Sequence, residues 1–170
     1  MKKIASFSPR TSNQIRSSKI GVGFECIERK MWDDTPELYR FAGETGVKHA
    51  RVLTGWFRTE TEKGKYDFSW LDKAVALAAK YDLKVIMCTS TATPPVWMSR
   101  KYPEILLKNE DGTVLAHGAR QHASFASPLY RELSYKMIEK LAQHYGSDSR
   151  IVGWQLVNEP ALQFDYNPKA

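Results

Sequence analysis

The sequence is poor in cysteine and lacks the ligand spacing of a metal site. Its two cysteines, Cys26 and Cys88, form no Cys-x-x-Cys pair and no Cys/His cluster. Two cysteines are too few for a disulfide framework. Both lie near the ends of predicted strands, so we expect small buried thiols and neither a structural disulfide nor a bound metal.

Long apolar segments are also missing. The opening, MKKIASFSPRTSNQIRSS, has the basic start of a signal peptide but not its apolar run of about seven or more residues. No segment has the length of a transmembrane helix. We therefore expect a cytoplasmic protein with no membrane partner; a secreted enzyme without its signal peptide is the alternative. Residues 1–18 are predicted to be a polar leader and residues 19–170 the folded domain.

A concentrated basic stretch is absent, although the net charge is +6. Lysines and arginines alternate with acidic residues, and no nucleic-acid-binding fingerprint occurs. The glycine pattern of a dinucleotide site fails, because Gly21-Val22-Gly23 lies inside a predicted strand and lacks a third glycine. A phosphate-binding loop is missing too. The sequence therefore predicts neither a nucleic-acid partner nor a cofactor.

Apolar runs and amphipathic segments alternate along the chain. Apolar runs predict strands at residues 19–26, 47–53, 83–88 and 151–157, and helical spacing predicts helices at residues 36–45, 70–81 and 128–145. This alternation indicates βαβ units and a parallel sheet, either doubly wound or a (β/α)8 barrel. The long loop at residues 89–127 is of a length that usually carries function.

A carboxylate follows the fourth predicted strand directly, in Asn158-Glu159-Pro160. Active sites of parallel α/β folds assemble at the carboxyl ends of the strands. Burial among apolar strand ends raises the pKa of a carboxyl group into the range of a general acid. Taken alone, however, the tripeptide is better explained as the first turn after a strand.

Several further motifs occur in a consistent order. They are Tyr66–Asp72 (YDFSWLD), Thr91–Trp97 (TATPPVW), Lys101–Glu104 (KYPE), Ser127–Glu132 (SPLYRE) and Ile151–Glu159 (IVGWQLVNE). Over roughly residues 47–160 the sequence resembles the family-42 β-galactosidases, within a large clan of barrel glycoside hydrolases. The resemblance implies an α/β fold: the N-terminal half of a (β/α)8 TIM barrel, with about four parallel strands and alternating helices.

The resemblance also implies roles for individual residues. Glu159 matches the catalytic acid/base, and Asn158 matches the residue that holds the hydroxyl next to the reacting carbon. Arg51 matches an arginine beside the nucleophile, where a guanidinium keeps a carboxylate ionised. Arg120 matches an arginine that helps to grip the sugar. Ser124 replaces a zinc-binding cysteine of many relatives, so no structural metal is expected.

Two tryptophans and one histidine allow more than one interpretation. Trp97 follows Pro94-Pro95, and it either stacks on a pyranose or packs under its loop. Trp56 follows the second predicted strand and is placed as a residue that lines the cleft. His122 is interpreted as a loop or packing residue rather than a catalytic one.

The second carboxylate of a retaining glycosidase has no candidate here. Such enzymes need two carboxyl groups about 5–5.5 Å apart, and in this clan the nucleophile ends the seventh strand. We therefore expect a β-galactosidase-like hydrolase of O-glycosyl bonds whose acid/base half is this chain, inactive alone. The alternative is a truncated or engineered half-barrel with a structural or carbohydrate-binding role. Open sheet edges predict a homo-oligomer, or a complementing chain with the second half of the barrel.

Overall fold

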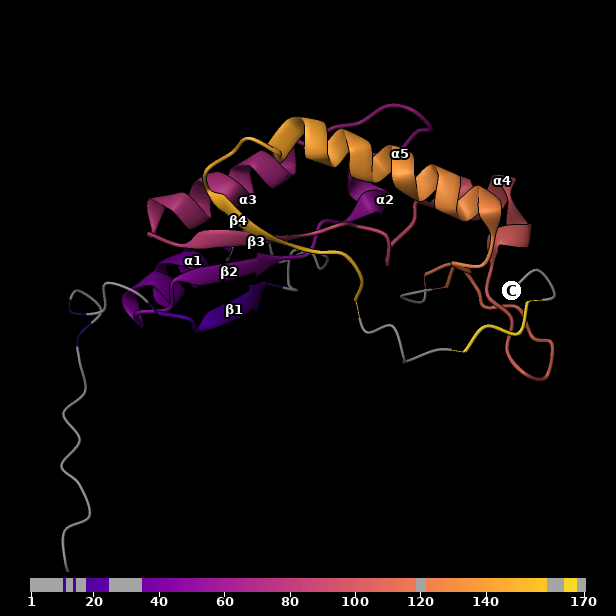
Figure 1. Ribbon diagram of the computed structural model, residues 1–170, viewed down its shortest axis with the longest axis horizontal. Helices are drawn as coiled ribbons and strands as arrows, with labels where there is room; N and C mark the ends of the chain where they lie inside the picture. The colour runs from indigo at the N-terminus through magenta and orange to yellow at the C-terminus, as the bar shows by residue number, and fades with distance from the viewer. Residues whose placement is uncertain are drawn as a thin grey trace, which may run out of the picture.

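The computed structural model describes residues 11, 14, 18–24, 35–118, 122–158 and 164–167. Most of the predicted leader and Cys26 lie outside these ranges. Four strands form one sheet in chain order, and each pairs in parallel with the next (Figure 1). They are β1 (Gly21–Phe24), β2 (His49–Val52), β3 (Lys84–Cys88) and β4 (Ile151–Gln155). The predicted parallel sheet is confirmed, and each strand is shorter than its apolar run.

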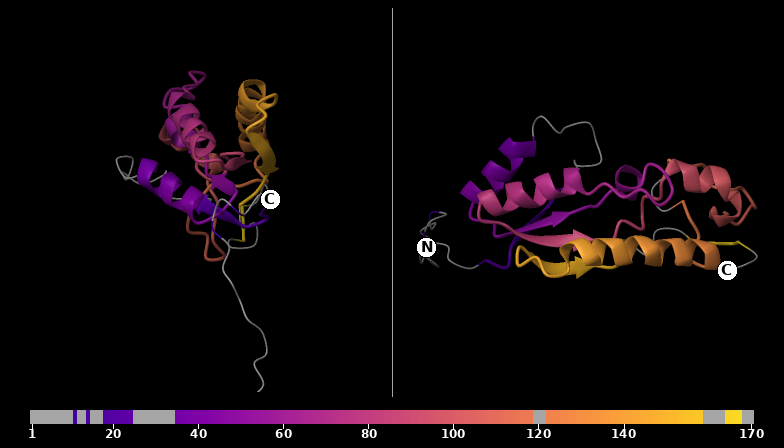
Figure 2. Two further views of the ribbon diagram at one scale, coloured as in Figure 1. Left: turned by 90° about the vertical axis from the view of Figure 1, so that its left-hand side faces the viewer. Right: turned by 90° about the horizontal axis from the view of Figure 1, so that it is seen from above.

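Three helices connect the strands, as predicted. They are α1 (Thr35–Glu44), α3 (Ser69–Lys80) and α5 (Pro128–Tyr145). Figure 2 shows that all three lie on one side of the sheet, fanned around it. Each connection between paired parallel strands therefore contains a helix, which is the repeating unit of an α/β fold.

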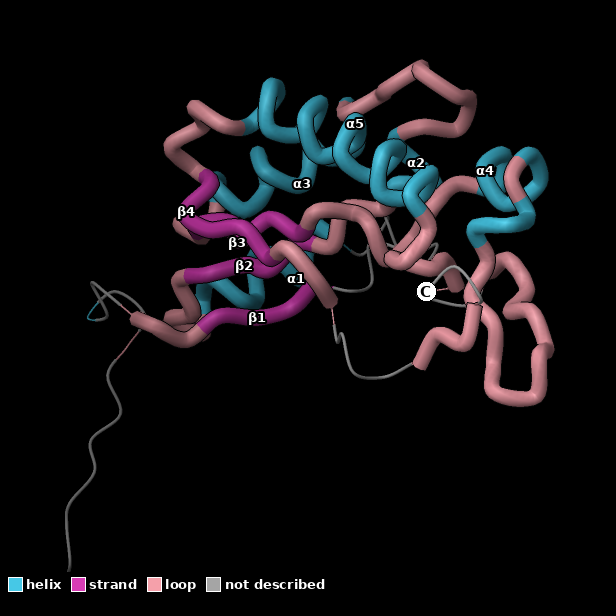
Figure 3. The backbone as a smooth tube through the Cα atoms, turned by 45° about the vertical axis from the view of Figure 1, so that its right-hand side comes forward, coloured by secondary structure: helices cyan, strands magenta, loops and turns pink. Residues whose placement is uncertain are grey.

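The predicted loop at residues 89–127 contains short helices that the sequence analysis missed. They are α4 (Val96–Lys101) and the 3-10 helix η3 (Pro103–Ile105), and a further short helix, α2 (Trp56–Thr59), follows β2. Segments of three to six residues are too short to show a helical period. Figure 3 shows α2, α4 and the long loops beyond the carboxyl ends of the strands.

Alternation along the two central strands decides which side chains face the helices. Ala50 and Val52 of β2, and Val85 and Met87 of β3, are completely buried. Since successive strand residues point to opposite faces, Arg51 and Ile86 point to the other face. The buried partners on the helices are Leu71, Ala74, Val75 and Ala78 of α3 and Met137 and Leu141 of α5.

A bulge interrupts the pairing of β3 with β4. Val85 pairs with Ile151, but Ile86 pairs with Gly153, so Val152 has no counterpart. Val152 is 51% exposed and Trp154 is 38% exposed. The apolar run at residues 151–157 therefore does not make a fully buried strand, and the described residues cover Trp154 only in part.

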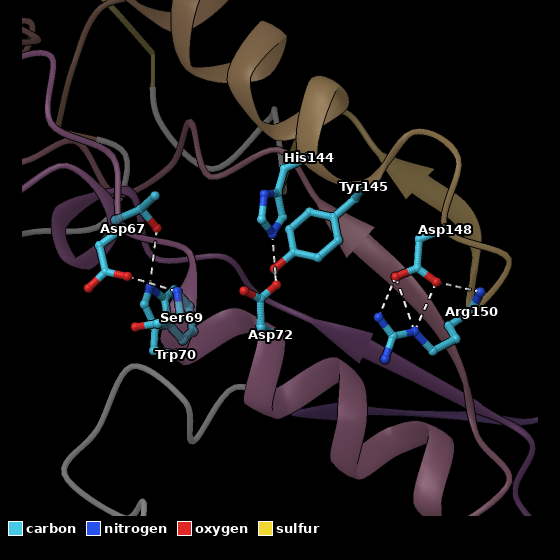
Figure 4. Close-up of polar contacts among 9 residues, drawn as sticks. Asp67, Ser69, Trp70, Asp72, His144, Tyr145, Asp148 and Arg150 are labelled. Carbon is cyan, nitrogen blue, oxygen red and sulfur yellow. Dashed lines mark hydrogen bonds and ion pairs between the residues drawn. The ribbon is translucent and has the colours of Figure 1, made fainter.

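Polar contacts join α3 to α5 at one end of the helix layer (Figure 4). Asp72 of α3 accepts hydrogen bonds from His144 Nε2 at 2.8 Å and from the Tyr145 hydroxyl at 2.7 Å. Phe68 stacks on the His144 ring with 4.7 Å between the centroids. At the start of α3, Asp67 Oδ1 accepts the backbone N–H of Ser69, which is the first helical residue.

Among the described residues, no helix combines the length and the apolar character that crossing a bilayer requires.

Because side chains of β3 alternate between the two faces of the sheet, truncating two neighbouring residues should lower the free energy of unfolding unequally. Met87→Ala removes a completely buried side chain, and we expect it to lower the free energy of unfolding by about 2–5 kcal/mol. Ile86→Ala is the matched control on the opposite, partly exposed face, and its loss is expected to be smaller. Urea denaturation followed by circular dichroism measures both. Equal losses would contradict the assignment of the two faces.

Candidate active site at the carboxyl ends of the strands

Two residues that the sequence predicted for the site meet in the structure. Arg51 of β2 donates from Nη1 to Asn158 Oδ1 at 3.3 Å and to Gln155 Oε1 at 2.7 Å. Hydrogen bonds from an ionised donor are stronger than those between neutral groups. The guanidinium thus reaches over β3 to the end of β4, on the face of the sheet opposite α3 and α5. Glu159 and Arg120 lie outside the described residues.

Gln155 is a site residue that the sequence analysis did not single out. Its Nε2 donates to the Val157 carbonyl at 3.0 Å and to Asn158 Oδ1 at 3.2 Å. Its Oε1 accepts from Arg51 and from the Cys88 thiol, the latter at 3.0 Å. Cys88 is a buried thiol, as predicted. A signal was present, because Gln155 is a polar residue inside the apolar run IVGWQLV.

Buried hydroxyl groups also connect the carboxyl ends of the strands to one another. Thr54, just after β2, donates to the Cys88 carbonyl at the end of β3 and contacts the Ser90 hydroxyl. Thr89 donates to the Leu156 carbonyl after β4 at 2.7 Å. Ser90 adopts the left-handed conformation, with φ of 65°, which is uncommon for residues other than glycine. Arg51 and Gln155 therefore come from strands whose carboxyl ends are joined by hydrogen bonds through β3.

The two predicted tryptophans point into the protein. Trp56 is 1% exposed, and its indole N–H donates to Glu60 Oε2 at 2.6 Å. This burial differs from the expected position along the cleft, because almost no Trp56 surface is accessible to a sugar. Trp97 is partly buried against the core and donates to the Glu60 carbonyl at 2.8 Å. These contacts of Trp97 favour packing under its loop over stacking on a pyranose.

Glu60 organises the segment between β2 and α3. Its side chain is buried, with 3% of its surface exposed. Besides Trp56, the Gly64 backbone N–H donates to Oε1 at 2.7 Å. Burial, followed by the charge and the hydrogen bond of Glu60, raises the pKa of Tyr66 to about 12. With these donors, the buried Glu60 side chain anchors the segment between β2 and α3.

Two histidines, His117 and His122, lie in the long loop after β3. His122 is 2% exposed, and its ring meets the ring of His117 edge to face at 4.7 Å. His117 also hydrogen-bonds the Ser99 hydroxyl of α4 at 2.8 Å, and burial lowers its pKa. The predicted packing role of His122 agrees with this burial. In the ranges that the structure covers, no three His, Cys, Asp or Glu side chains gather as metal ligands.

Comparison with known proteins identifies the family. The family model of glycoside hydrolase family 42, described as beta-galactosidase, matches residues 24–170. The chain belongs to this family. The resemblance inferred from the motifs is thereby confirmed.

Curated relatives agree with this membership. The β-galactosidase BbgII of Bifidobacterium bifidum is 36% identical over 143 residues, which cover 83% of this chain and 20% of that protein. A β-galactosidase of Thermus thermophilus is 40% identical over 132 residues, covering 77% of this chain and 20% of the relative. The chain thus spans about a fifth of the length of the curated relatives that it matches.

A solved family-42 structure confirms the fold class. The β-galactosidase of the psychrophilic Marinomonas ef1 superimposes with a TM-score of 0.80 at 31% identity, over 89% of this chain and 24% of that one. The four parallel strands and their alternating helices match the N-terminal portion of such TIM-barrel enzymes. The carboxyl ends of these strands are the face on which barrel enzymes build active sites.

The Glu60 anchor leads to a prediction about stability and titration. Glu60→Gln leaves a buried donor without its carboxylate acceptor, so we expect the free energy of unfolding to fall by about 1–3 kcal/mol. Without the negative charge, the pKa of Tyr66 should fall from about 12 towards its usual value of about 10 but stay above it, since burial is the larger cause.

The pH dependence has a definite sign. Because the pKa of Tyr66 is higher in the folded than in the unfolded state, its contribution to stability is present below about pH 10 and is lost as the pH rises towards 12. In Glu60→Gln this loss should be smaller. Ultraviolet titration, compared with the same proteins carrying Tyr66→Phe, measures the pKa. Glu62→Gln, an exposed neighbour paired with Lys65, is the control; an equal effect there would contradict the anchor role.

Proposed function

We propose that the protein is a β-galactosidase-like retaining glycoside hydrolase in which Glu159 is the catalytic acid/base. The observation that carries this proposal is the contact of Arg51 with Asn158, the residue directly before Glu159, at the end of β4. Family membership supports the same roles. Glu159 directly follows Asn158 in the sequence, and Asn158 belongs to the cluster that joins β2 to β4.

The chemistry follows from these positions. Glu159 as an acid gives its proton to the glycosidic oxygen while a second carboxylate attacks the anomeric carbon; as a base it then takes a proton from the water that releases the sugar. Asn158 would hydrogen-bond the hydroxyl next to the reacting carbon. Arg51 would stabilise the ionised form of the second carboxylate. No metal or cofactor takes part in this proposal.

The family pattern places the second carboxylate at the end of a seventh strand, outside the four strands described here. We therefore propose that a second part of the barrel, called the complement below, contributes the remaining β/α units. Two apolar edges support it. At β1 and α1 lies a groove of about 460 Å³ lined by Val22, Phe24, Leu38 and Phe41, and along β4 Val152, Trp154 and Leu156 are exposed. An unpaired parallel edge with exposed apolar side chains is suited to further strands.

The complement is proposed to be the remaining part of a family-42 barrel, whether on the same polypeptide or on another. A second copy of these 170 residues is the competing arrangement, and light scattering of the purified chain distinguishes them. The cytoplasmic location stays a prediction from the sequence.

Assays with and without the complement test the function. The 170-residue chain alone should show no hydrolysis of an aryl β-galactoside above the blank, because it supplies one of the two carboxylates. Joined to the remaining barrel of the Marinomonas relative, it should turn the substrate over. Robust activity of the chain alone would overturn the division of roles, and binding without turnover by the joined protein would favour the carbohydrate-binding alternative.

Substitution of the acid/base tests Glu159 itself. In the joined protein, Glu159→Gln should lower kcat/KM by about 10²–10⁴-fold, since the side chain no longer transfers a proton. The loss should be greater for substrates with poorer leaving groups, which need protonation more. Glu139→Gln, in which an exposed glutamate of α5 is changed, is the matched control. Equal activity of the two variants would show that Glu159 is not the catalytic acid/base.

A further inference from the structure

Gln155 has a side-chain amide whose orientation is determined by its neighbours. Its Oε1 receives the Arg51 guanidinium at 2.7 Å and the Cys88 thiol at 3.0 Å, while its Nε2 faces the Val157 carbonyl at 3.0 Å and Asn158 Oδ1 at 3.2 Å. The reversed amide would place an N–H against the guanidinium and an oxygen against a carbonyl. Both contacts are repulsive, because they would pair donor with donor and acceptor with acceptor.

The orientation of the Gln155 amide also fixes the orientation of the Asn158 amide. Asn158 Oδ1 accepts from Gln155 Nε2 at 3.2 Å and from Arg51 Nη1 at 3.3 Å. These two donors direct the oxygen of the Asn158 amide towards the strands. Its nitrogen is then on the opposite side of the side chain, so the group that Asn158 turns away from the cluster is a hydrogen-bond donor.

We infer that Gln155 is a positioning residue: it holds Arg51 and orients the Asn158 amide so that an N–H, and not a carbonyl oxygen, meets the substrate hydroxyl next to the reacting carbon. This inference rests on the proposed function for the identity of the ligand. It adds a residue that acts on the substrate only through Arg51 and Asn158.

The chemistry of the position explains why glutamine fits it. A glutamate accepts from Arg51 and Cys88 but has no N–H for Asn158 and Val157, so it sets negative oxygens against two acceptors. A methionine has a similar length and none of the hydrogen bonds. Both substitutions keep the size of the side chain, so both test orientation rather than packing.

Kinetics of the joined protein test the inference. Gln155→Met should lower kcat/KM for an aryl β-galactoside by about 10- to 100-fold, since a displacement of about 1 Å costs on the order of 100-fold. The 2-deoxy analogue, which lacks the hydroxyl in question, should lose far less. In Asn158→Ala, adding Gln155→Met should lower kcat/KM by a smaller factor than it does in the unsubstituted protein, because only its effect through Arg51 remains. Gln143→Met, in an exposed glutamine of α5, should be unchanged on both substrates.

Equal losses on the two substrates would overturn the inference, since a merely structural role affects both alike. That result would leave the proposed function standing if Glu159→Gln still lowers kcat/KM by about 10²–10⁴-fold.

A second readout needs no catalysis and therefore separates the two proposals. In the isotopically labelled 170-residue chain, Gln155→Met should shift the side-chain amide signals of Asn158 and the guanidinium signals of Arg51, while Gln143→Met leaves both in place. Unchanged signals would overturn the inference even if the joined protein is active. Shifted signals would support the positioning contacts even if it is not.

Discussion

The candidate site depends on one constraint, which is that α1, α3 and α5 cover a single face of the parallel sheet (Figure 2). Ala50, Val52, Val85 and Met87 fill the helix-facing side and are fully buried. Strand residues alternate between faces, so the same packing that buries Ala50 and Val52 directs Arg51 to the other face. A slip of one residue in the register of β2 would exchange these two sets.

Two sets of hydrogen bonds hold the strand ends together. Thr54 and Thr89, which follow β2 and β3, bond to carbonyls of the neighbouring strand ends. The Gln155 amide at the end of β4 joins Arg51 of β2 to Asn158. Hydrogen bonds in a partly buried network restrict one another's geometry. Arg51 and Gln155 are therefore presented by two strands whose ends are already bonded together.

Glu60 and the residue before Glu159 have different hydrogen-bond partners. Glu60 directly follows α2, whereas Asn158 comes shortly after the end of β4. Glu60 is buried beneath Trp56 and accepts from its indole N–H and from the Gly64 backbone, so it stabilises the segment leading to α3. The residue before Glu159 instead belongs to the cluster around Arg51. Sequence position beyond a strand is thus not enough to assign a role to a carboxylate, because its hydrogen-bond partners are needed as well.

The sequence by itself determined the order of strands and helices, the parallel sheet and the family, because periodicity and short motifs are local properties of the chain. It did not reveal α2, α4 or η3, which are too short for a period. It placed Trp56 along the cleft, whereas the structure buries this side chain, and it did not single out Gln155. Arg51 and Gln155 are 104 residues apart, and their contact exists only because β2 and β4 flank β3 in one sheet. Which polar groups meet, and which are buried, was decided by the tertiary structure, since it brings distant segments within hydrogen-bonding distance.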